Sequence, residues 1–457
     1  MRIIVAGAGV VGLSIAWELL NRGHQVTVCD ATPGNGASHA AAGMLAPAAE
    51  MVWGEDELAP IMARAARLYP DFEASVRLAS GIDAHRKTEG TLVIGAERSD
   101  AQRIWELIEA QRAAGNPTER LTGSQARRLE PALGPRIVGG VSHPGDHQID
   151  PRTYAVALQA ALLAKGATFV RANVARVVEA PAGGSATAIL DDGDTSPAGT
   201  ASAGATASPE TAPSSPATGY IHPAAEHRIG AEGTRLEADE IILATAVWQV
   251  PGVEELNVRP QRGDVIRVRI PAGHPPLVSR VVRGQVAGRP IYLVPRFDNS
   301  LVIGATTRED DLEAPSTEGV WQLLDDARRI VPGIVDTTID DVVARSRPGT
   351  HDGLPIIGRL APGIIASTGF SRHGILLSPW GAAVTADVAE AALPDGAGTR
   401  APLTPEELAA SATSSLSTTT GAEAAAALAA DPLATAPLQA SAAAPQAEPL
   451  QAAPTRA

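Results

Sequence analysis

The sequence contains a single cysteine, Cys29, among its 457 residues. One thiol excludes an internal disulfide bond and a metal site built from several thiolates, and it is typical of a reducing compartment. The chain also lacks an apolar run near the roughly 20 residues that span a bilayer, and no signal peptide precedes the first predicted strand. We therefore expect a cytoplasmic protein with no membrane span and no metal site.

Basic residues are in the minority, since 37 Lys and Arg stand against 51 Asp and Glu and give a net charge of −14. The arginines are scattered and form no basic stripe of the kind that a nucleic-acid backbone requires, so we expect no nucleic-acid partner. Hydrophobic residues make up 44% of the chain. That content is enough for two domains with a continuous core and favours a multi-domain enzyme.

The apolar pattern alternates between strands and helices along most of the chain. Residues 2–30 are typical of a βαβ unit, and a second helix is expected from the N-cap Asp150 to Gly166, ahead of a strand at 168–171. Further strands are predicted at 91–96, 238–245, 264–270, 289–295, 300–306 and 363–368, and further helices at 58–78, 100–114, 317–330 and 374–392. The pattern predicts an α/β fold.

Two segments differ in composition from the rest. Residues 180–233 are rich in Ala, Gly, Ser, Thr and Pro, and they have too few large apolar groups to offset the entropy of ordering. We interpret them as a flexible low-complexity insertion. Residues 395–457 are similarly rich in Ala, Pro and Thr and predict a disordered tail.

The first strand is followed by Gly7-Ala8-Gly9-Val10-Val11-Gly12, a GxGxxG pattern ahead of a helix. Gly7 permits the turn, Gly9 admits a pyrophosphate, and Gly12 lets the helix pack closely on the strand. Asp30 closes the second strand, where an acidic side chain can accept both ribose hydroxyls. The context predicts a dinucleotide site but does not separate FAD from NAD.

The next segment, Gly36–Pro47, is a run of small residues in which backbone amides can approach a long flat ligand. Its alternative interpretation is a simple alanine-rich helix, which Gly43 and the preceding glycines would weaken. Here the chain resembles the D-amino-acid-oxidase superfamily, most closely the glycine oxidases of thiamine-thiazole synthesis. The resemblance implies FAD as the cofactor.

The resemblance continues downstream in the family's order. Residues 289–296 and 301–306 resemble the family's substrate-domain strands, 346–358 resembles its return to the flavin domain, and 368–375 resembles its last cofactor contact. It implies a Rossmann-like, doubly wound FAD-binding domain and a second α+β substrate domain built on an antiparallel sheet. The expected FAD-binding domain comprises residues 1–85, 140–179, 234–258 and 340–394, and the substrate domain comprises 86–139 and 259–339.

The resemblance also implies which residues contact FAD. The helix after His373 would direct its N-terminal amides at the flavin and stabilise the reduced state. The implied cofactor residues are Gly7, Gly9, Val10, Val11, Gly12, Asp30, Ala31, Ala37, Ser38, Ala42, Gly43, Met44, Val174, Phe370, Ser371, Arg372, His373, Gly374, Ile375 and Leu376.

Four residues are candidates for the substrate. Arg347 matches the family's carboxylate-binding arginine, and a guanidinium offers a planar fork for two oxygens; pairing with Asp352 is the alternative. Tyr292 resembles the family's pocket tyrosine, which can donate to the same carboxylate, and core packing is its alternative. Arg372 could hold a substrate or a structural carboxylate, or lie on the surface. Met44 would shape the pocket.

The implied reaction is the oxidation of glycine or another small amino acid by hydride transfer to flavin N5, which requires no protein acid or base. The imine yields an oxo acid and ammonia or feeds the thiazole branch of thiamine synthesis, and dioxygen returns the flavin to its oxidised state with release of hydrogen peroxide. The alternatives are a sarcosine or D-amino-acid oxidase, a dehydrogenase with another electron acceptor, and a non-catalytic dinucleotide-binding protein. Related glycine oxidases are tetramers, so the resemblance allows a homo-oligomer.

The sequence departs from the family at three places. Ala244–Trp248 has alanine where the family usually has glycine before its tryptophan, and Thr307 replaces a larger apolar residue of some members. Histidyl attachment of FAD in some relatives needs two alanines before the glycine, but three separate His39 from Gly43. With Cys29 expected in the core, we predict non-covalent FAD.

Overall fold

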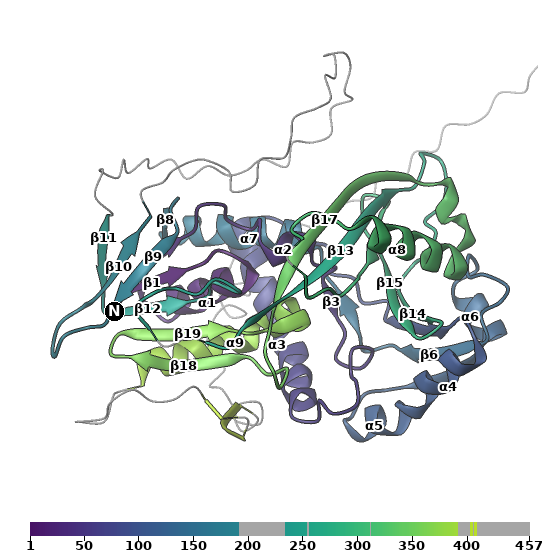
Figure 1. The fold of residues 1–457 in the computed structure, drawn as a ribbon, viewed down its shortest axis with the longest axis horizontal. Helices are drawn as coiled ribbons and strands as arrows, with labels where there is room; N and C mark the ends of the chain where they lie inside the picture. Colours follow the sequence, from purple (N-terminus) through teal and green to yellow (C-terminus); the bar gives the residue numbers. More distant parts are fainter. Residues whose placement is uncertain (192–233, 254–255, 311, 392–402, 405, 409–457) are drawn as a thin grey trace, which may run out of the picture. The chain divides into compact units, whose positions relative to one another are not determined.

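The computed structural model describes residues 1–191, 234–253, 256–310, 312–391, 403–404 and 406–408. They belong to one compact unit, Met1–Leu416, which contains two large sheets with their helices (Figure 1). In these ranges no helix has the length and apolar character needed to cross a bilayer. The boundaries between a cofactor domain and a substrate domain stay a prediction.

The first large sheet has six strands in the order β18-β19-β12-β1-β2-β8. Five strands are parallel, and β18 pairs antiparallel with β19 at one edge. The strands are β1 (Arg2–Ala6), β2 (Gln25–Cys29), β8 (Thr168–Val170), β12 (Glu240–Leu243), β18 (Ile356–Ala361) and β19 (Ile364–Thr368). The strand order reverses at β1, and sheets of this kind bind ligands beyond the carboxyl ends of the strands at such a point.

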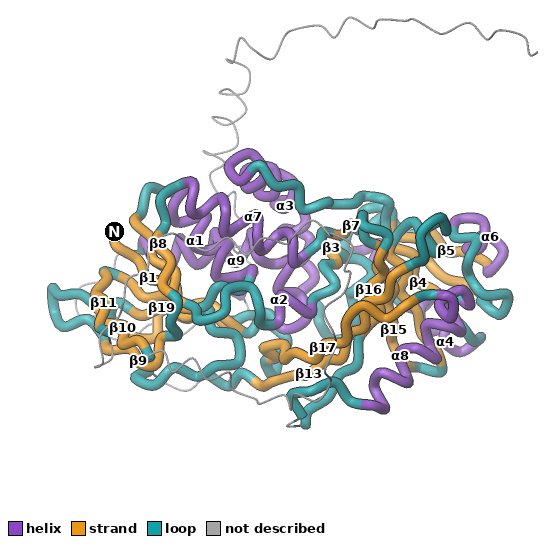
Figure 2. Tube along the Cα trace, turned by 90° about the horizontal axis from the view of Figure 1, so that it is seen from above, coloured by secondary structure: helices purple, strands orange, loops and turns teal. Residues whose placement is uncertain are grey.

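Alternate residues of β1 enter two different cores. Ile3 and Val5 pack with helices, whereas Ile4 and Ala6 pack with a small three-stranded sheet on the other face. The helices are α1 (Val10–Asn21), α3 (Leu58–Ser80), α7 (Pro151–Ala164) and α9 (Gly374–Glu390), which lie together in Figure 2. The covering sheet contains β9 (Val174–Val178), β10 (Ala186–Leu190) and β11 (Arg235–Ala238). Because the six-stranded sheet is buried on both faces, most residues of its strands are apolar.

The second large sheet has eight strands in the order β17-β13-β16-β15-β14-β4-β6-β5, antiparallel except for the β14–β4 pair. One face packs against helices through Ile266, Leu293 and Ile303. The strands are β4 (Thr91–Gly95), β5 (Glu119–Thr122), β6 (Gly139–His143), β13 (Arg259–Arg269), β14 (Val281–Val286), β15 (Arg289–Pro295), β16 (Ser300–Gly304) and β17 (Thr338–Gly349), and the helices are α4 (Arg98–Glu106), α5 (Ile108–Ala113), α6 (Gly123–Leu129) and α8 (Thr317–Ile330).

Short elements complete the described part of the fold. They are α2 (Ala37–Ala40), β3 (Met44–Leu45), β7 (His147–Gln148), and the single-turn helices η1 (Pro332–Asp336) and η2 (Ser371–His373). Strands β3 and β7 pair with each other. The buried Arg296, just after β15, donates to the main-chain oxygens of Ala42 and Ile149 at 2.6 and 3.1 Å. The glycine-rich segment is thereby fixed against the eight-stranded sheet.

The predicted Rossmann-like α/β fold with a second sheet-based part is confirmed. The Asp150 cap is also present, because its carboxylate accepts from the N–H groups of Arg152 and Thr153 and Pro151 begins α7. The single helix predicted at 100–114 is wrong: the structure has α4 and α5, with Leu107 between them.

The predicted limits of the two low-complexity segments are too wide. Ala186–Leu190 form β10, because Ala186, Ala188 and Leu190 alternate inward and fill the narrow core against β1 and β12. In the tail, the Leu403 N–H donates to the Ile357 oxygen at 2.8 Å, and Leu408 is buried in the helical core. The remaining residues of both segments, 192–233 and most of 395–457, lie outside the described residues.

Candidate active site

The glycines between β1 and α1 have different surroundings. Gly7 has φ +104°, and a Cβ there would overlap the main-chain oxygen of Ala244. A Cβ on Gly12 would overlap the main-chain oxygen of Gly7. Around Gly9, by contrast, the Ser38 Oγ at 3.4 Å is the nearest described atom to that position. Gly7 and Gly12 allow close packing of the chain, and Gly9 leaves space for a ligand as the fingerprint requires.

Polar groups surround this turn. The Ser38 Oγ, on α2 just after Ala37, accepts from the Val10 N–H at 2.9 Å at the start of α1. The Asp30 carboxylate accepts from the N–H groups of Ala8 and Thr32 at 2.7 and 2.8 Å, and burial raises its pKa. Each oxygen keeps a lone pair for a ribose hydroxyl.

Two further predicted cofactor residues are Ala31, which follows β2, and Val174, which begins β9. The exposed Ala31 donates its N–H to the Asn173 side-chain oxygen at 3.2 Å. Val174 is buried in the same core as Cys29. Cys29 is 1% exposed, and burial raises its pKa to about 12, so its thiol is not a nucleophile at neutral pH. Non-covalent binding of FAD stays a prediction.

The N-termini of two long helices converge here. The ideal Cβ position on Gly374, the first residue of α9, lies 3.8 Å from the Val11 Cγ2 in α1 and 3.7 Å from the Phe370 Cβ. The first turn of each helix has N–H groups without an intrahelical acceptor and a positive end of the helix dipole. Ser371, at φ +47°, turns the chain into α9, and Ile375 and Leu376 are buried below. The convergence suits a ligand with a pyrophosphate and an electron-accepting ring.

The predicted substrate residues lie on the face of the eight-stranded sheet opposite its helices. Tyr292 packs in one cluster with Met44 and Ala42, and burial raises the pKa of its phenol against the positive charge of Arg347. Gly43, at φ +71°, allows this approach because a Cβ would overlap the Ile149 oxygen. The structure therefore brings Tyr292, Met44 and the glycine-rich segment together.

Arg347 has space for its guanidinium because Gly263, two residues along β13 from its register partner Gln261, has no side chain. Its two terminal nitrogens lie 2.6 and 2.7 Å from the Cβ position on Gly263, and Nη1 donates to the Thr306 oxygen at 3.4 Å. The Asp352 carboxylate accepts instead from the Leu354 N–H at 3.0 Å. Within the described ranges no carboxylate forms an ion pair with Arg347, so the Asp352 alternative is not what the structure has.

Arg372 has a different role from the one that we expected at the substrate. Its Nη2 forms an ion pair with Glu55 and donates to the main-chain oxygen of Glu50. Of the roles considered for Arg372, the structure has the pairing with a structural carboxylate. Neighbouring His373 is buried and places Nδ1 3.5 Å from the Glu50 Oε2.

Two residues of the site, Glu50 and Arg283, were not predicted from the sequence. The Arg283 Nη1 donates to the Glu50 Oε1 at 2.6 Å, and Glu50 is only 5% exposed. Burial alone would raise the pKa of Glu50, but Arg283, His373 and Arg372 together lower it to about 2. One signal was visible in the sequence: Glu50 is the first charged residue after Asp30.

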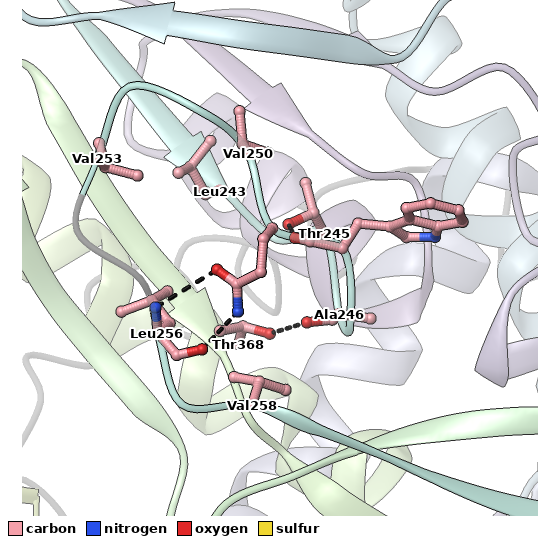
Figure 3. Close-up of a pocket in the computed structure, with 10 residues that line it drawn as sticks. Leu243, Thr245, Ala246, Val250, Val253, Leu256, Val258 and Thr368 are labelled. Atoms are coloured by element: carbon pink, nitrogen blue, oxygen red, sulfur yellow. Dashed lines mark hydrogen bonds between the residues drawn. The ribbon is translucent and has the colours of Figure 1, made fainter. Parts of the chain in front are cut away.

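A small pocket lies next to this site but contains none of the predicted substrate residues (Figure 3). It is lined mainly by apolar residues from the end of β12 onward, such as Leu243, Val250 and Val253. Thr368 donates to the Ala246 oxygen at 2.8 Å and holds that alanine at φ +55°, where the family usually has glycine. We interpret the pocket as the packing of this loop.

Comparisons with known proteins agree with this geometry. A protein-family model described as FAD dependent oxidoreductase matches residues 2–388. The chain is 32% identical over 84% of its length to the bifunctional protein ThiO/ThiG of Trichormus variabilis, of which it spans only 52%, about half. It is 27% identical to the glycine oxidase of Geobacillus kaustophilus, over 85% of this chain and 92% of that one.

The crystal structure of glycine oxidase from Geobacillus kaustophilus superposes with a TM-score of 0.70 at 26% identity, over 86% of this chain and 97% of that one. The glycine turn, the two converging helix N-termini and the match of nearly the whole described chain all point to one cofactor. The chain belongs to the FAD dependent oxidoreductase family, and its cofactor is FAD.

Proposed function

We propose that this enzyme catalyses the oxidative deamination of glycine or a similar small amino acid. The products are glyoxylate or the corresponding oxo acid, ammonia and hydrogen peroxide, with dioxygen and water consumed. The imine is the first product, and we propose that it supplies the thiazole branch of thiamine biosynthesis. The relatives named glycine oxidase and ThiO/ThiG support this proposal.

The observation that carries the proposal is the unneutralised guanidinium of Arg347 beside the phenol of Tyr292. A half-buried cation without a carboxylate partner among the described residues is costly unless a ligand supplies the negative charge. A guanidinium fork suits the two oxygens of an amino-acid carboxylate, and a phenol can donate to the same group. Together they would hold an amino acid by its acid end.

When bound, FAD supplies the two-electron acceptor. The residues that would hold it are Gly9 and Val10 at the start of α1, Asp30 at the end of β2, and the turn from Phe370 into α9. The amino acid would lose the hydrogen of its α-carbon with the bonding electrons, and the amine lone pair would form the C=N bond. Arg347 and Tyr292 act by binding and orienting, and no residue is assigned as acid or base.

The packing around Tyr292 favours small substrates in this proposal. Met44 and Tyr292 pack together with the partly buried Ala305, which closes the space over the sheet. Thr307, where some relatives have a larger apolar residue, is exposed. We therefore expect glycine and N-methylglycine to be better substrates than bulky amino acids.

The test is peroxide release by the purified holoenzyme with glycine, sarcosine, D-proline and D-alanine. For Arg347→Leu we expect kcat/KM for glycine to fall about 100-fold, mainly through KM, because charge-assisted hydrogen bonds to the carboxylate are lost. The bound flavin should remain. Arg328→Leu, which removes an exposed arginine of α8, is the matched control.

Three results would change the proposal. Turnover of D-proline without glycine would make the enzyme a D-amino-acid oxidase. Substrate reduction of the flavin without reoxidation by air would make it a dehydrogenase. Unchanged kinetics in Arg347→Leu would remove the assignment of this arginine.

A further inference from the structure

A second guanidinium lies on the same face of the sheet as Tyr292. Arg283 in β14 is directly opposite Tyr292 in β15, so both side chains leave the sheet on one side. Its Nη1 lies 3.9 Å from the Met44 Sδ. The positive charges of Arg347, Arg283 and the buried Arg267 lower the pKa of Tyr292, against burial, which raises it. Two of these cations, Arg347 and Arg283, flank the candidate pocket.

Strand register places Arg347 on this face as well. Tyr292 is opposite Gly304, Gly304 is opposite Val265, and Val265 is opposite Val343. Arg347 is four residues beyond Val343 on β17, and side chains alternate along a strand, so Arg347 has the same orientation as Val343. The two guanidinium groups come from β17 and β14, on opposite sides of Tyr292 in the strand order.

The two cations differ in their neutralisation. Arg283 donates to the Glu50 carboxylate at 2.6 Å, and this carboxylate is also within 3.5 Å of His373. Glu50 is ionised at neutral pH because Arg283, first among its neighbours, and a hydrogen bond to His373 lower its pKa to about 2, although burial opposes them. Arg347 donates to a main-chain oxygen. One cation is thus available to a substrate acid group and the other is already paired.

We propose, on the basis of the proposed amino-acid oxidation, that Glu50 determines specificity by neutralising Arg283 and so restricts the enzyme to substrates with one acid group. A second carboxylate on the substrate would have to displace Glu50 from Arg283. Because Glu50 is buried and already oriented, it stays bound to Arg283 in preference to a second substrate carboxylate. Amino dicarboxylates are therefore excluded.

The experiment compares sarcosine with iminodiacetate, which adds one carboxylate to the N-methyl group of sarcosine. In the Glu50→Gln holoenzyme, Arg283 loses its counter-charge, and the kcat/KM ratio of iminodiacetate to sarcosine should rise about tenfold. The double variant Glu50→Gln/Arg283→Gln is the matched control and should lose this gain. An unchanged ratio in Glu50→Gln, or an equal gain in the double variant, would overturn the proposal.

Binding of inert acids gives a readout that needs no turnover. Calorimetric titration of each holoenzyme with acetate and with malonate should show the same tenfold shift toward malonate in Glu50→Gln. Arg283→Gln, which removes the cation that a second carboxylate would bind, should shift the ratio toward acetate. If the wild type oxidises no amino acid but these binding ratios shift, the proposed reaction fails and the role of Glu50 stands. If glycine is oxidised and the ratios stay constant, only the role of Glu50 fails.

Discussion

Gly304 and Tyr292 face each other across β16 and β15, and a side chain at Gly304 would occupy the position of the Tyr292 phenol. The phenol can lie flat over β16 only because this residue has no Cβ. The register of β15 with β16 therefore determines where the phenol of Tyr292, a predicted substrate-binding group, lies.

Gly304→Ala should therefore displace Tyr292 without affecting the glycine turn at α1. We expect kcat/KM for glycine to fall about tenfold or more, since a hydrogen bond to a charged group is lost, while the flavin content stays constant. Steady-state kinetics and the visible absorbance of the flavin measure both. Gly145→Ala is a suitable control because no atom lies within 4 Å of its Cβ position. Equal activity in both variants would contradict the role of Tyr292.

The glycines of the first turn allow a second prediction, which separates ligand contact from packing. Gly12→Ala would press α1 against the Gly7 oxygen, and such overpacking costs about 1–3 kcal/mol of unfolding free energy. Gly9→Ala meets only the Ser38 Oγ, so the apoprotein should keep its Tm but bind FAD several-fold more weakly. Thermal unfolding of the apoproteins and titration with FAD would test this. Loss of stability in both variants would mean that Gly9 is also a packing residue.

Local signals were sufficient to predict the cofactor side of the molecule. The GxGxxG turn, Asp30 and the Asp150 cap each depend on a few adjacent residues, and the structure places them where the local pattern predicts. The segment 36–47 and the turn before α9 were identified by resemblance. These two segments follow β2 and β19, and the parallel strand order brings the carboxyl ends of both strands to one edge of the sheet.

The charge pairs at the site could not be predicted from local signals. Glu50 and Arg283 are separated by 233 residues in sequence, and their contact depends on the register of β14 with β15. Arg372 and Glu55 are likewise far apart in sequence, and their pairing depends on how the η2 turn meets the loop before α3. Strand β10 was missed for another reason: alanines bury little area each, so composition alone does not show that they fill a narrow core.

The ion pair of Glu240 and Arg359 gives a third prediction, about stability. The Arg359 Nη1 donates to both Glu240 oxygens at 2.7 and 2.6 Å, and both side chains are largely buried in the first sheet. Glu240→Gln would leave a buried guanidinium without a counter-charge and should cost about 3–5 kcal/mol of unfolding free energy. The adjacent Asp239→Asn, which breaks an exposed pair with Arg2, should cost about 0–1 kcal/mol. Urea denaturation of both variants would reveal the difference, and equal costs would show that burial of the pair is unimportant.

The last prediction concerns Asp146, a fully buried carboxyl in the turn between β6 and β7. Burial raises its pKa to about 7, and the charge of Glu50 adds to this, although the N–H groups of Ala48 and Ala49 favour the ionised form. Because this pKa lies above the unfolded value of 3.8, the folded state binds the proton more tightly. The proton on Asp146 therefore stabilises the folded state fully below about pH 4, and this stabilisation is lost as the pH rises through 7.

Asp146→Asn resembles the protonated form and cannot ionise. Its unfolding free energy relative to the wild type should therefore increase between pH 5 and pH 8, by about 1 kcal/mol or more. Thermal unfolding across this range measures the effect, and the exposed Asp71→Asn serves as the control. If the difference between variant and wild type instead stays constant across this range, the Asp146 carboxyl is ionised throughout, and the hydrogen bonds donated by the two N–H groups outweigh its burial.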